Sequence, residues 1–268
     1  MHYWAGVNPP FFSYDNLRSL FARLRALGWA GPLRDWHGQN GTILRHDVDL
    51  SIQRAHDMAV LEKECGIRSS FFVLTTNCVY NPMTARHRAL LGEMAQEGFE
   101  IGLHFDPTVY GDASDQELAE HARREADQLS DAAGTPVTSL SIHCPSVHGL
   151  MPLIEGFVNA YDPKVFQAER YWSDSCMSPR KELWPVVEMA ASGLVQVLIH
   201  PFHFSVHGCG YDKLIPDHVG SMLDELDQTF RRDNHLYRKV FPRPLGQYLP
   251  LQDPGADQSV RDTAPMEA

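Results

Sequence analysis

Five short segments of the sequence carry histidine or aspartate directly after a run of apolar residues. These polar endings are His46–Asp49, His104–Asp106, His143, Asp174 and His200. Imidazole and carboxylate groups bind transition metals and transfer protons near neutral pH. Five such endings in order are not expected from structure alone, because buried histidine and aspartate side chains need partners. We therefore expect these side chains to form one metal-and-carboxylate site.

The elements that must position these residues follow from the hydrophobic pattern. Strands are predicted at residues 42–47, 69–75, 99–105, 137–142 and 194–199, with shorter ones at 157–161 and 170–173. Helices are predicted between them, at residues 14–27, 51–65, 84–97, 114–133, 179–191 and 217–236. This alternation indicates βαβ units with a parallel sheet. About seven such units favour a barrel, whose site lies at the carboxyl ends of the strands.

Length and charge limit the classes of protein that the chain can belong to. The 268 residues carry a formal net charge of -11, which argues against a nucleic-acid partner. We expect a single domain over residues 1–251, with a helical extension at 1–40 packed on it and a flexible tail at 252–268. The sequence shows no secretory leader and no membrane span, and its five cysteines form no Cys-x-x-Cys pair. We therefore expect a cytoplasmic protein with reduced thiols and no membrane partner.

The residue types suggest a division of roles within the site. Two carboxylates as close as Asp47 and Asp49 rarely serve one role, so one is expected to bind a metal and the other to act as a base. His104 and His143 are candidate metal ligands. His200 is a candidate general acid, which Asp174 would orient.

The order of these motifs resembles that of a known family. The segments Arg45-His-Asp-Val-Asp49, Glu100-Ile-Gly-Leu-His104, His143-Cys-Pro145, Ser173-Asp-Ser175 and Leu198-Ile-His-Pro201, with Phe71-Phe-Val, look like the ordered motifs of the polysaccharide deacetylase superfamily. This superfamily is also called the NodB-homology or carbohydrate esterase family 4 group. The resemblance covers residues 42–204. It implies a distorted (β/α)7 barrel of the NodB-homology type and a metal-dependent amide hydrolase, usually one that removes an N-acyl group from an amino sugar.

The resemblance assigns roles to individual residues in the first two motifs. Asp47 matches the family's catalytic base. The adjacent ligand position falls on Val48, so the ligand role is assigned to Asp49. His104 matches the first histidine of the second motif, but the second histidine falls on Thr108, which is a poor ligand.

The remaining motifs complete the expected site. Either His143 or Asp106 must replace the missing ligand, and we favour His143, which stands where the third motif usually carries arginine. Asp174, with Trp172 or Trp184, resembles the fourth motif, and His200 matches the catalytic histidine of the fifth. The implied cofactor is a divalent metal ion, with zinc favoured and cobalt, nickel or iron as alternatives.

Each assignment has a structural alternative. Asp49 would also fit as the N-cap of the helix that begins near Ser51, and Asp106 as a turn residue before Pro107. Arg45 either fixes a site carboxylate or forms a plain ion pair at the barrel rim. Trp172 and Trp184 would form an apolar wall for the substrate or pack in the core. Four residues are candidates for weaker contacts with the substrate: Arg45, Asp106, Trp172 and Trp184. His46 is interpreted as a structural residue bonded to a backbone carbonyl, and three further histidines are interpreted as loop residues: His148, His203 and His207.

Taken together, the sequence favours a hydrolase that acts on a small molecule. The expected partner is a soluble amino sugar or related compound with an N-acetyl or N-formyl group, used in glycan or natural-product biosynthesis. Two alternatives remain open: a hydrolase of linear or cyclic amides unrelated to sugars on the same barrel, and a glycan-binding barrel whose site has decayed.

Overall fold

The computed structural model describes residues 9–249. The chain divides into two compact units, residues 1–210 and 211–268, and each is described by itself. The expected single domain over 1–251 stays a prediction, and the tail expected at 252–268 lies outside the described residues.

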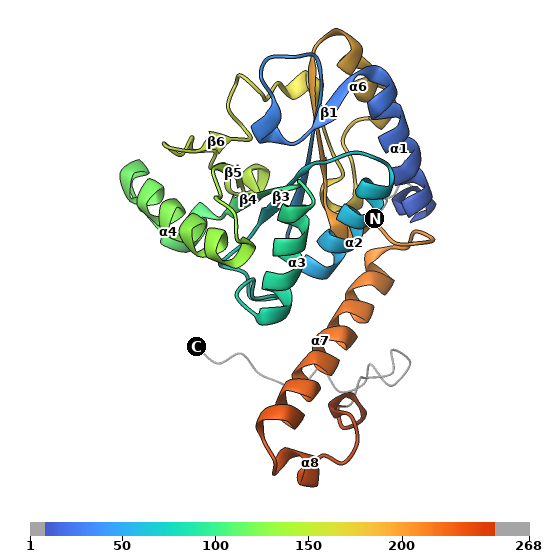
Figure 1. Cartoon of the computed structure of the whole chain (residues 1–268), viewed down its shortest axis with the longest axis vertical. Coiled ribbons are helices and arrows are strands. Elements are labelled where there is room, and N and C mark those ends of the chain that lie inside the picture. Colours follow the sequence, from blue (N-terminus) through green and yellow to red (C-terminus); the bar gives the residue numbers. More distant parts are fainter. Residues whose placement is uncertain (1–8, 250–268) are drawn as a thin grey trace, which may run out of the picture. The chain divides into compact units, whose positions relative to one another are not determined.

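The first unit is built on a sheet in which every paired strand is parallel to its neighbour (Figure 1). Its order is β6-β5-β4-β3-β2-β8-β7, and β1 pairs with β2 beside this path. The strands are β1 (Trp29–Gly31), β2 (Gly41–Val48), β3 (Ser70–Val73), β4 (Glu100–Phe105), β5 (Ser139–Ile142), β6 (Val158–Asn159), β7 (Tyr171–Ser173) and β8 (Leu194–Ile199). Because all strands run the same way, their carboxyl ends share one rim.

The sheet curls strongly enough to bring distant strands together. Arg45 on β2 donates from its guanidinium to the Ser141 hydroxyl on β5 at 2.8 Å, although β3 and β4 lie between these strands in the sheet. In the described part of the chain the end strands β6 and β7 are not paired with each other, so the curl forms a half-barrel. The predicted α/β class and distorted barrel are confirmed.

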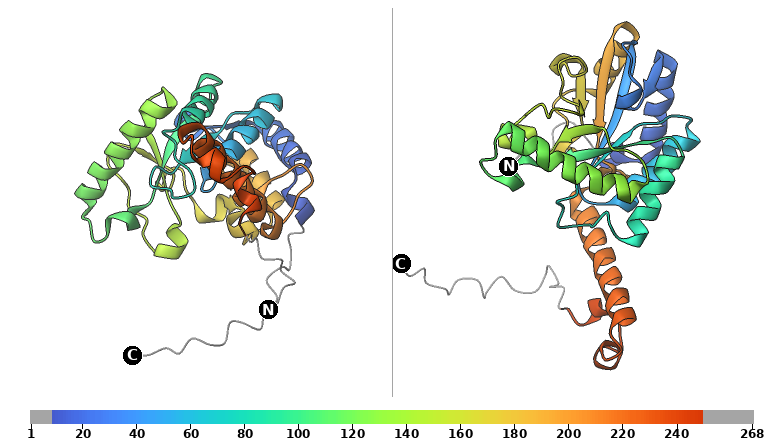
Figure 2. Two further views of the ribbon diagram at one scale, coloured as in Figure 1. Left: turned by 90° about the horizontal axis from the view of Figure 1, so that it is seen from below. Right: turned by 60° about the vertical axis from the view of Figure 1, so that its left-hand side comes forward.

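Helices cover the outer face of this curled sheet. Figure 2 shows α1 (Tyr14–Leu27), α2 (Ile52–Glu64), α3 (Ala85–Gln96) and α4 (Asp115–Ala133) as an arc outside the strands. Each begins at a side-chain cap that satisfies a free backbone N–H, and the four capping residues are Ser13, Ser51, Thr84 and Ser114. Because Ser51 caps α2, the N-cap alternative for Asp49 is wrong.

Two elements differ from the prediction in this unit. Strand β1 was not predicted, because three residues ending in glycine give too short a pattern to recognise. The helix expected at 179–191 is shorter, since α6 covers Leu183–Glu188 and a 3₁₀ helix follows at Met189–Ser192. Pro185 lies in the first turn of α6, where a missing N–H removes no intrahelical bond. A short helix, α5 (Pro145–His148), follows β5.

The second unit is helical where it is described. Helix α7 covers Tyr211–Asp233 and α8 covers Tyr237–Val240, whereas the sequence pattern predicted one helix at 217–236. The helix begins before the predicted residue, because Pro216 does not stop it. Pro216 lies close to the start of α7, where the missing N–H removes only one backbone hydrogen bond. Asp227 on α7 joins the two helices by accepting a hydrogen bond from the Tyr237 hydroxyl on α8 at 2.8 Å, and it accepts another from Arg231 on its own helix at 2.5 Å.

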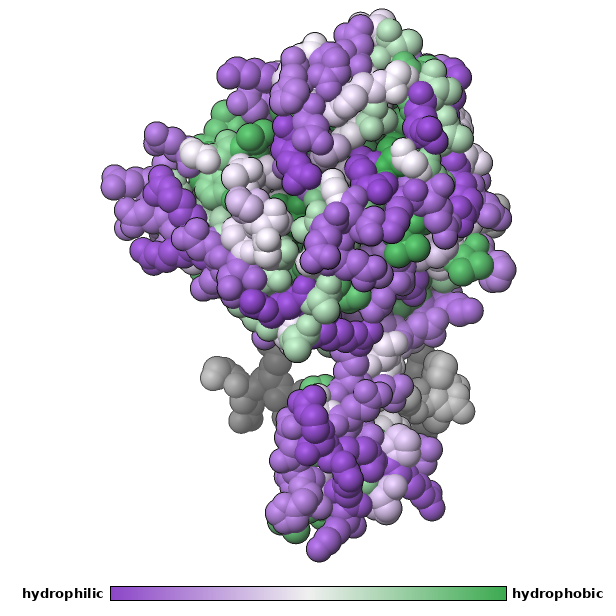
Figure 3. Space-filling view, in the orientation of Figure 1, coloured by the Kyte–Doolittle hydropathy of each residue, from purple (hydrophilic) through white to green (hydrophobic). Residues whose placement is uncertain are grey.

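In Figure 3 the face shown is mostly hydrophilic, with hydrophobic residues scattered among polar ones. No helix among residues 9–249 combines the length and the apolar character needed to cross a lipid bilayer.

The interior of the half-barrel leaves no room at one glycine. A Cβ atom on Gly102, in the middle of β4, would lie 2.5 Å from the Phe72 ring and 2.7 Å from the Ser139 hydroxyl. All three residues are in adjacent parts of β3, β4 and β5, and Phe72 is fully buried. Neither neighbour is the mobile end of an exposed side chain, so an added methyl group must displace the core.

We expect Gly102→Ala to destabilise the protein by about 1–3 kcal/mol, the usual cost of overpacking a core. The measurement is the free energy of unfolding from urea titration. Gly92→Ala is the matched control, because a Cβ at that helical position meets only one atom within 4 Å, at 3.9 Å. The control is expected to gain up to about 1 kcal/mol from helix propensity. Equal stability of the two variants would contradict the packing described.

Candidate active site

Strand β2 delivers alternate side chains to opposite faces of the sheet. Arg45 and Asp47 point into the half-barrel, and His46 points outward to α2. There the His46 Nε2 lies 2.5 Å from a Glu62 carboxylate oxygen, while its Nδ1 lies 3.3 Å from the Ile199 carbonyl oxygen. The interpretation of His46 as a structural residue bonded to a backbone carbonyl is confirmed.

Three predicted metal ligands converge at the ends of β2, β4 and β5. The Asp49 Oδ1 lies 3.3 Å from the His104 Nε2 and 3.8 Å from the His143 Nδ1. The two imidazole nitrogens are 3.1 Å apart. Each of these residues ends or directly follows its strand, so the curl of the sheet brings them together.

The orientation of His104 fits a cation at this point. Its Nδ1–H donates to the Ser141 carbonyl oxygen at 3.0 Å, which leaves a lone pair on Nε2. That lone pair faces the Asp49 Oδ1, a buried acceptor without a hydrogen-bond partner among the described residues. Ligands bound to zinc at about 2.0–2.2 Å in a tetrahedral site are about 3.3 Å apart. The observed separations are close to that value.

The protonation states of Asp49 and His143 suit metal ligands. Burial lowers the pKa of His104, but the Asp47 and Asp49 carboxylates outweigh burial and raise that pKa. Burial raises the pKa of Asp49, but the neighbouring imidazoles of His104 and His200 outweigh burial and hold the pKa well below its usual range. Burial and the nearby His104 lower the pKa of His143. A charged carboxylate and a neutral imidazole are the forms that bind a metal ion.

Asp47 lies beside this group as a buried carboxylate. Its Oδ2 is 3.7 Å from the His104 Nε2 and accepts a hydrogen bond from the Ser141 hydroxyl at 3.4 Å. Its Oδ1 is buried and has no hydrogen-bond partner among the described residues. A carboxylate oxygen with free lone pairs is able to accept a proton, as a general base must.

Arg45 holds the charge of Asp47 inside the half-barrel. Its guanidinium is 3.7 Å from the Asp47 Oδ2 and donates to the hydroxyls of Ser141 and Tyr161, both at 2.8 Å. Burial lowers the pKa of Arg45, but Asp47 outweighs it and raises the pKa above its usual range. Since Arg45 is fully buried, the alternative of a plain ion pair at the rim is wrong, and its contacts fix the position of Asp47.

His200 and Asp174 form a bonded pair at the ends of β8 and β7. The His200 Nδ1 donates to the Asp174 Oδ1 at 2.6 Å, and the His200 Nε2 lies 3.7 Å from the Asp49 Oδ2. Burial by itself lowers the pKa of His200, but the Asp174 carboxylate outweighs it and raises the pKa to about 10. The ring is therefore protonated at neutral pH, and its Nε2 proton faces the Asp49 group.

Asp106 lies outside the metal group and serves a loop. Its carboxylate accepts hydrogen bonds from the backbone N–H and the hydroxyl of Thr108, at 3.0 and 2.6 Å. Thr108, the residue at the position of the missing second histidine, is thus bound to Asp106. Of the two candidates for the third ligand, the geometry favours His143.

The two tryptophans differ in exposure. Trp172 is 2 % exposed and donates from its indole N–H to the Lys181 carbonyl oxygen at 2.9 Å, so the structure favours core packing for this residue. Trp184 is 45 % exposed on α6. A role for either in substrate binding stays a prediction.

Sequence reasoning missed several residues around the site. Ser141 and Tyr161 contact Arg45, and neither hydroxyl stands in a distinctive motif. His203 was interpreted as a loop residue, but its side chain is buried and its Nδ1 lies 2.9 Å from the Asp174 Oδ2. The signal that would have found it is the spacing of His200 and His203 by three residues.

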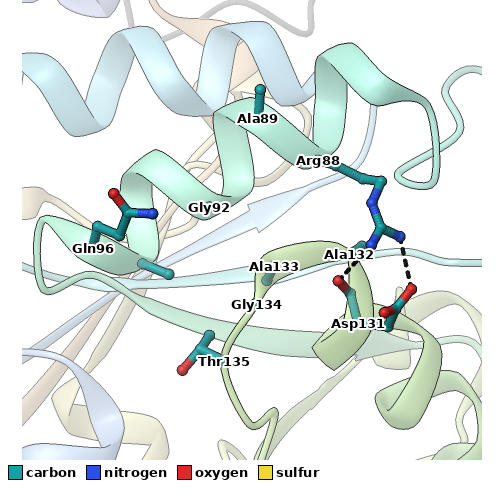
Figure 4. Close-up of a pocket in the computed structure, with 10 residues that line it drawn as sticks. Arg88, Ala89, Gly92, Gln96, Asp131, Ala132, Ala133, Gly134 and Thr135 are labelled. Atoms are coloured by element: carbon teal, nitrogen blue, oxygen red, sulfur yellow. Dashed lines mark hydrogen bonds and ion pairs between the residues drawn. The ribbon is translucent and has the colours of Figure 1, made fainter.

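A surface groove between α3 and α4 lies away from this site (Figure 4). It runs along α3 from Arg88 to Gln96 and reaches the C-terminal end of α4. These helix ends lead into the starts of β4 and β5, whereas the site lies at the ends of these strands. An ion pair of 2.8 Å between Arg88 and Asp131 borders it. Its other walls are mostly small residues: Ala89, Gly92, Ala95, Ala132, Ala133 and Gly134.

Comparison with known proteins gives similarities of structure only. No family model and no curated protein sequence matches the chain. The matching structures include a chitin deacetylase from Colletotrichum lindemuthianum, with a TM-score of 0.42 and 15% identity, over 68% of this chain and 83% of that one. A peptidoglycan N-acetylglucosamine deacetylase catalytic domain from Eubacterium rectale matches with a TM-score of 0.40 and 14% identity, over 67% and 84%.

A third match is a carbohydrate esterase family 4 pseudoenzyme from Bacillus anthracis. Its TM-score is 0.40 and its identity 14%, over 68% of this chain and 62% of that one. These three neighbours come from the superfamily that the motifs resemble. At TM-scores this low the similarities carry no argument of their own, and this chain spans less than two thirds of the pseudoenzyme.

The pKa of His200 predicts how stability depends on pH. A pKa raised on folding, from 6.5 to about 10, stabilises the protein fully below the unfolded value, and this contribution is lost as pH rises through the folded value. We expect the urea midpoint of metal-free protein to fall between about pH 7 and pH 10. The fall should be smaller in His200→Gln. A fall of equal size in both proteins would show that His200 does not cause this dependence of stability on pH.

Proposed function

We propose that the chain is a divergent member of the polysaccharide deacetylase superfamily and a metal-dependent hydrolase that removes an N-acyl group. The observation that carries the proposal is the convergence of three possible ligand atoms, Asp49 Oδ1, His104 Nε2 and His143 Nδ1, beside a buried carboxylate oxygen of Asp47. A binding site without catalysis gives no reason for this arrangement next to the His200–Asp174 pair.

The proposed cofactor is one divalent metal ion held by Asp49, His104 and His143. Two imidazoles and one carboxylate suit zinc, and also cobalt, nickel or iron. When bound, such an ion polarises an acyl carbonyl and makes the attacking water more acidic.

The chain's own residues supply the proton transfers. Asp47 takes a proton from the attacking water as the new carbon–oxygen bond forms at the acyl carbon. His200 gives its Nε2 proton to the leaving nitrogen as the carbon–nitrogen bond breaks. The products are a carboxylic acid and a free amine. Arg45 keeps Asp47 in place, and Asp174 keeps His200 protonated.

The proposed substrate is a small amino sugar or related compound with an N-acetyl or N-formyl group, in a cytoplasmic pathway of glycan or natural-product biosynthesis. A panel separates this from the alternatives: N-acetyl- and N-formylglucosamine, their uridine-diphosphate forms, and non-sugar imides and ureides. Release of amine from the sugars alone supports the proposal. Turnover of imides or ureides alone indicates a non-sugar amidase, and no turnover by metal-loaded protein indicates a decayed site.

Metal content tests the ligand set. We expect about one divalent metal per chain in the wild type, measured by elemental analysis after dialysis against zinc. His143→Ala should bind it at least about tenfold more weakly, because even loss of a supporting partner of a ligand costs about 10–100-fold. Asp106→Ala should keep the wild-type affinity. The reverse pattern would move the third ligand to Asp106.

The assignment of Asp47 as base is tested by Asp47→Asn. We expect turnover of the best sugar in the panel to fall by about 10²–10⁴-fold, the usual contribution of a general base. Metal content should not change, because Asp47 is not among the proposed ligands. Asp131→Asn, an exposed aspartate on α4, is the matched control with normal turnover. Loss of metal from Asp47→Asn would show that base and ligand are exchanged.

A further inference from the structure

The Asp174 carboxylate is shared by two histidines. Its Oδ1 accepts from the His200 Nδ1 at 2.6 Å, and its Oδ2 accepts from the His203 Nδ1 at 2.9 Å. The backbone N–H of His200 lies 3.1 Å from both oxygens. Asp174 is fully buried, so these bonds compensate its charge without water. Both oxygens are engaged, which fixes the plane of the carboxylate.

One turn of backbone places both rings. Residues Pro201–His203 form a 3₁₀ helix that begins after His200, and the His203 N–H donates to the His200 carbonyl oxygen at 3.0 Å. Side chains three residues apart eclipse in a 3₁₀ helix. The two ring centroids are accordingly 5.0 Å apart, with planes inclined at 35°.

The position of His203 is itself constrained by packing. Its side chain is 5 % exposed, and the Phe12 ring packs edge-on against it at a centroid distance of 5.9 Å. A buried and packed donor holds a carboxylate in one orientation better than an exposed one, because fewer alternative rotamers are open to it.

We propose that His203 is a positioning residue, which fixes the proton donor His200 through Asp174. This inference rests on the proposed function, in which His200 protonates the leaving amine. Without the bond from His203, Oδ2 keeps only the backbone N–H of His200, and the carboxylate is free to turn. The His200 ring turns with it, and its Nε2 no longer faces Asp49.

The same three residues also form a group that could hold a metal ion. Hydrogen bonding describes the group better, because the Nδ1 atoms of both rings already lie at bonding distance from the carboxylate. Metal content distinguishes the two cases in the experiment below.

The experiment compares His203→Leu, which removes the donor and keeps the bulk, with His203→Asn, whose amide N–H₂ takes the place of the ring Nδ1–H. His207→Asn, in the loop that follows, is the control for disturbing this segment. Each variant is assayed with the best N-acyl sugar of the panel and with 4-nitrophenyl acetate, whose leaving group needs no proton.

We expect His203→Leu to lower kcat on the N-acyl sugar by about 10–100-fold without changing KM, the cost usual for loss of an orienting partner. Hydrolysis of 4-nitrophenyl acetate should change less than about threefold, because general acid catalysis does not assist that leaving group. His203→Asn should restore the sugar activity. An equal loss on both substrates, or no loss on either, would overturn the inference.

A second readout does not depend on activity. In proton–nitrogen NMR spectra of metal-free protein labelled at histidine, the His200 Nδ1–H signal is identified by its loss in His200→Gln. It should shift in His203→Leu and return toward the wild-type position in His203→Asn. An unchanged signal in His203→Leu overturns the inference, and so does a second metal ion that both His203 variants lose. If the wild type hydrolyses no N-acyl sugar, the proposed function fails while these spectra still decide the role of His203.

Discussion

The structure depends on the compensation of charge buried on one strand. β2 carries Arg45, His46 and Asp47 in succession, and all three are buried. A buried charge needs polar partners close to it, and two of the partners here come from other elements. Arg45 requires Ser141 on β5, His46 requires Glu62 on α2, and Asp47 requires Arg45 beside it. The contact from Arg45 to Ser141 crosses the interior of the curled sheet, and the same curl brings the site residues together.

The arrangement divides stabilising and chemical roles between the two faces of the same strand. On the outer face, His46 and Glu62 satisfy each other and leave no group for a ligand. On the inner face, Asp47 and Asp49 each keep an oxygen without a hydrogen-bond partner in the described part of the chain. Both carboxylates lie within 4 Å of the His104 Nε2, in the group proposed above to hold a metal ion.

Sequence reasoning found the strands because apolar runs ending in a polar group are local patterns. The predicted ends of β2, β4, β5 and β8 place Asp49, His104, His143 and His200 on one rim. It could not find Ser141 or Tyr161, since they matter only because Arg45 reaches them across the half-barrel. In the sequence they lie 96 and 116 positions away from Arg45. It also misjudged His203, because burial of a residue after a strand depends on Phe12, far away in the chain.

The pairing of β2 with β8 has a consequence for synthesis of the chain on the ribosome. β2 ends at Val48, but its partner β8 begins only at Leu194, and the two pair over six residues from Gly41–His46. Until that late segment has left the ribosome, one edge of the central strand has no partner and its apolar residues lie open to other chains. The pairing of the sheet around β2 is therefore completed only after more than half of the chain has been synthesised.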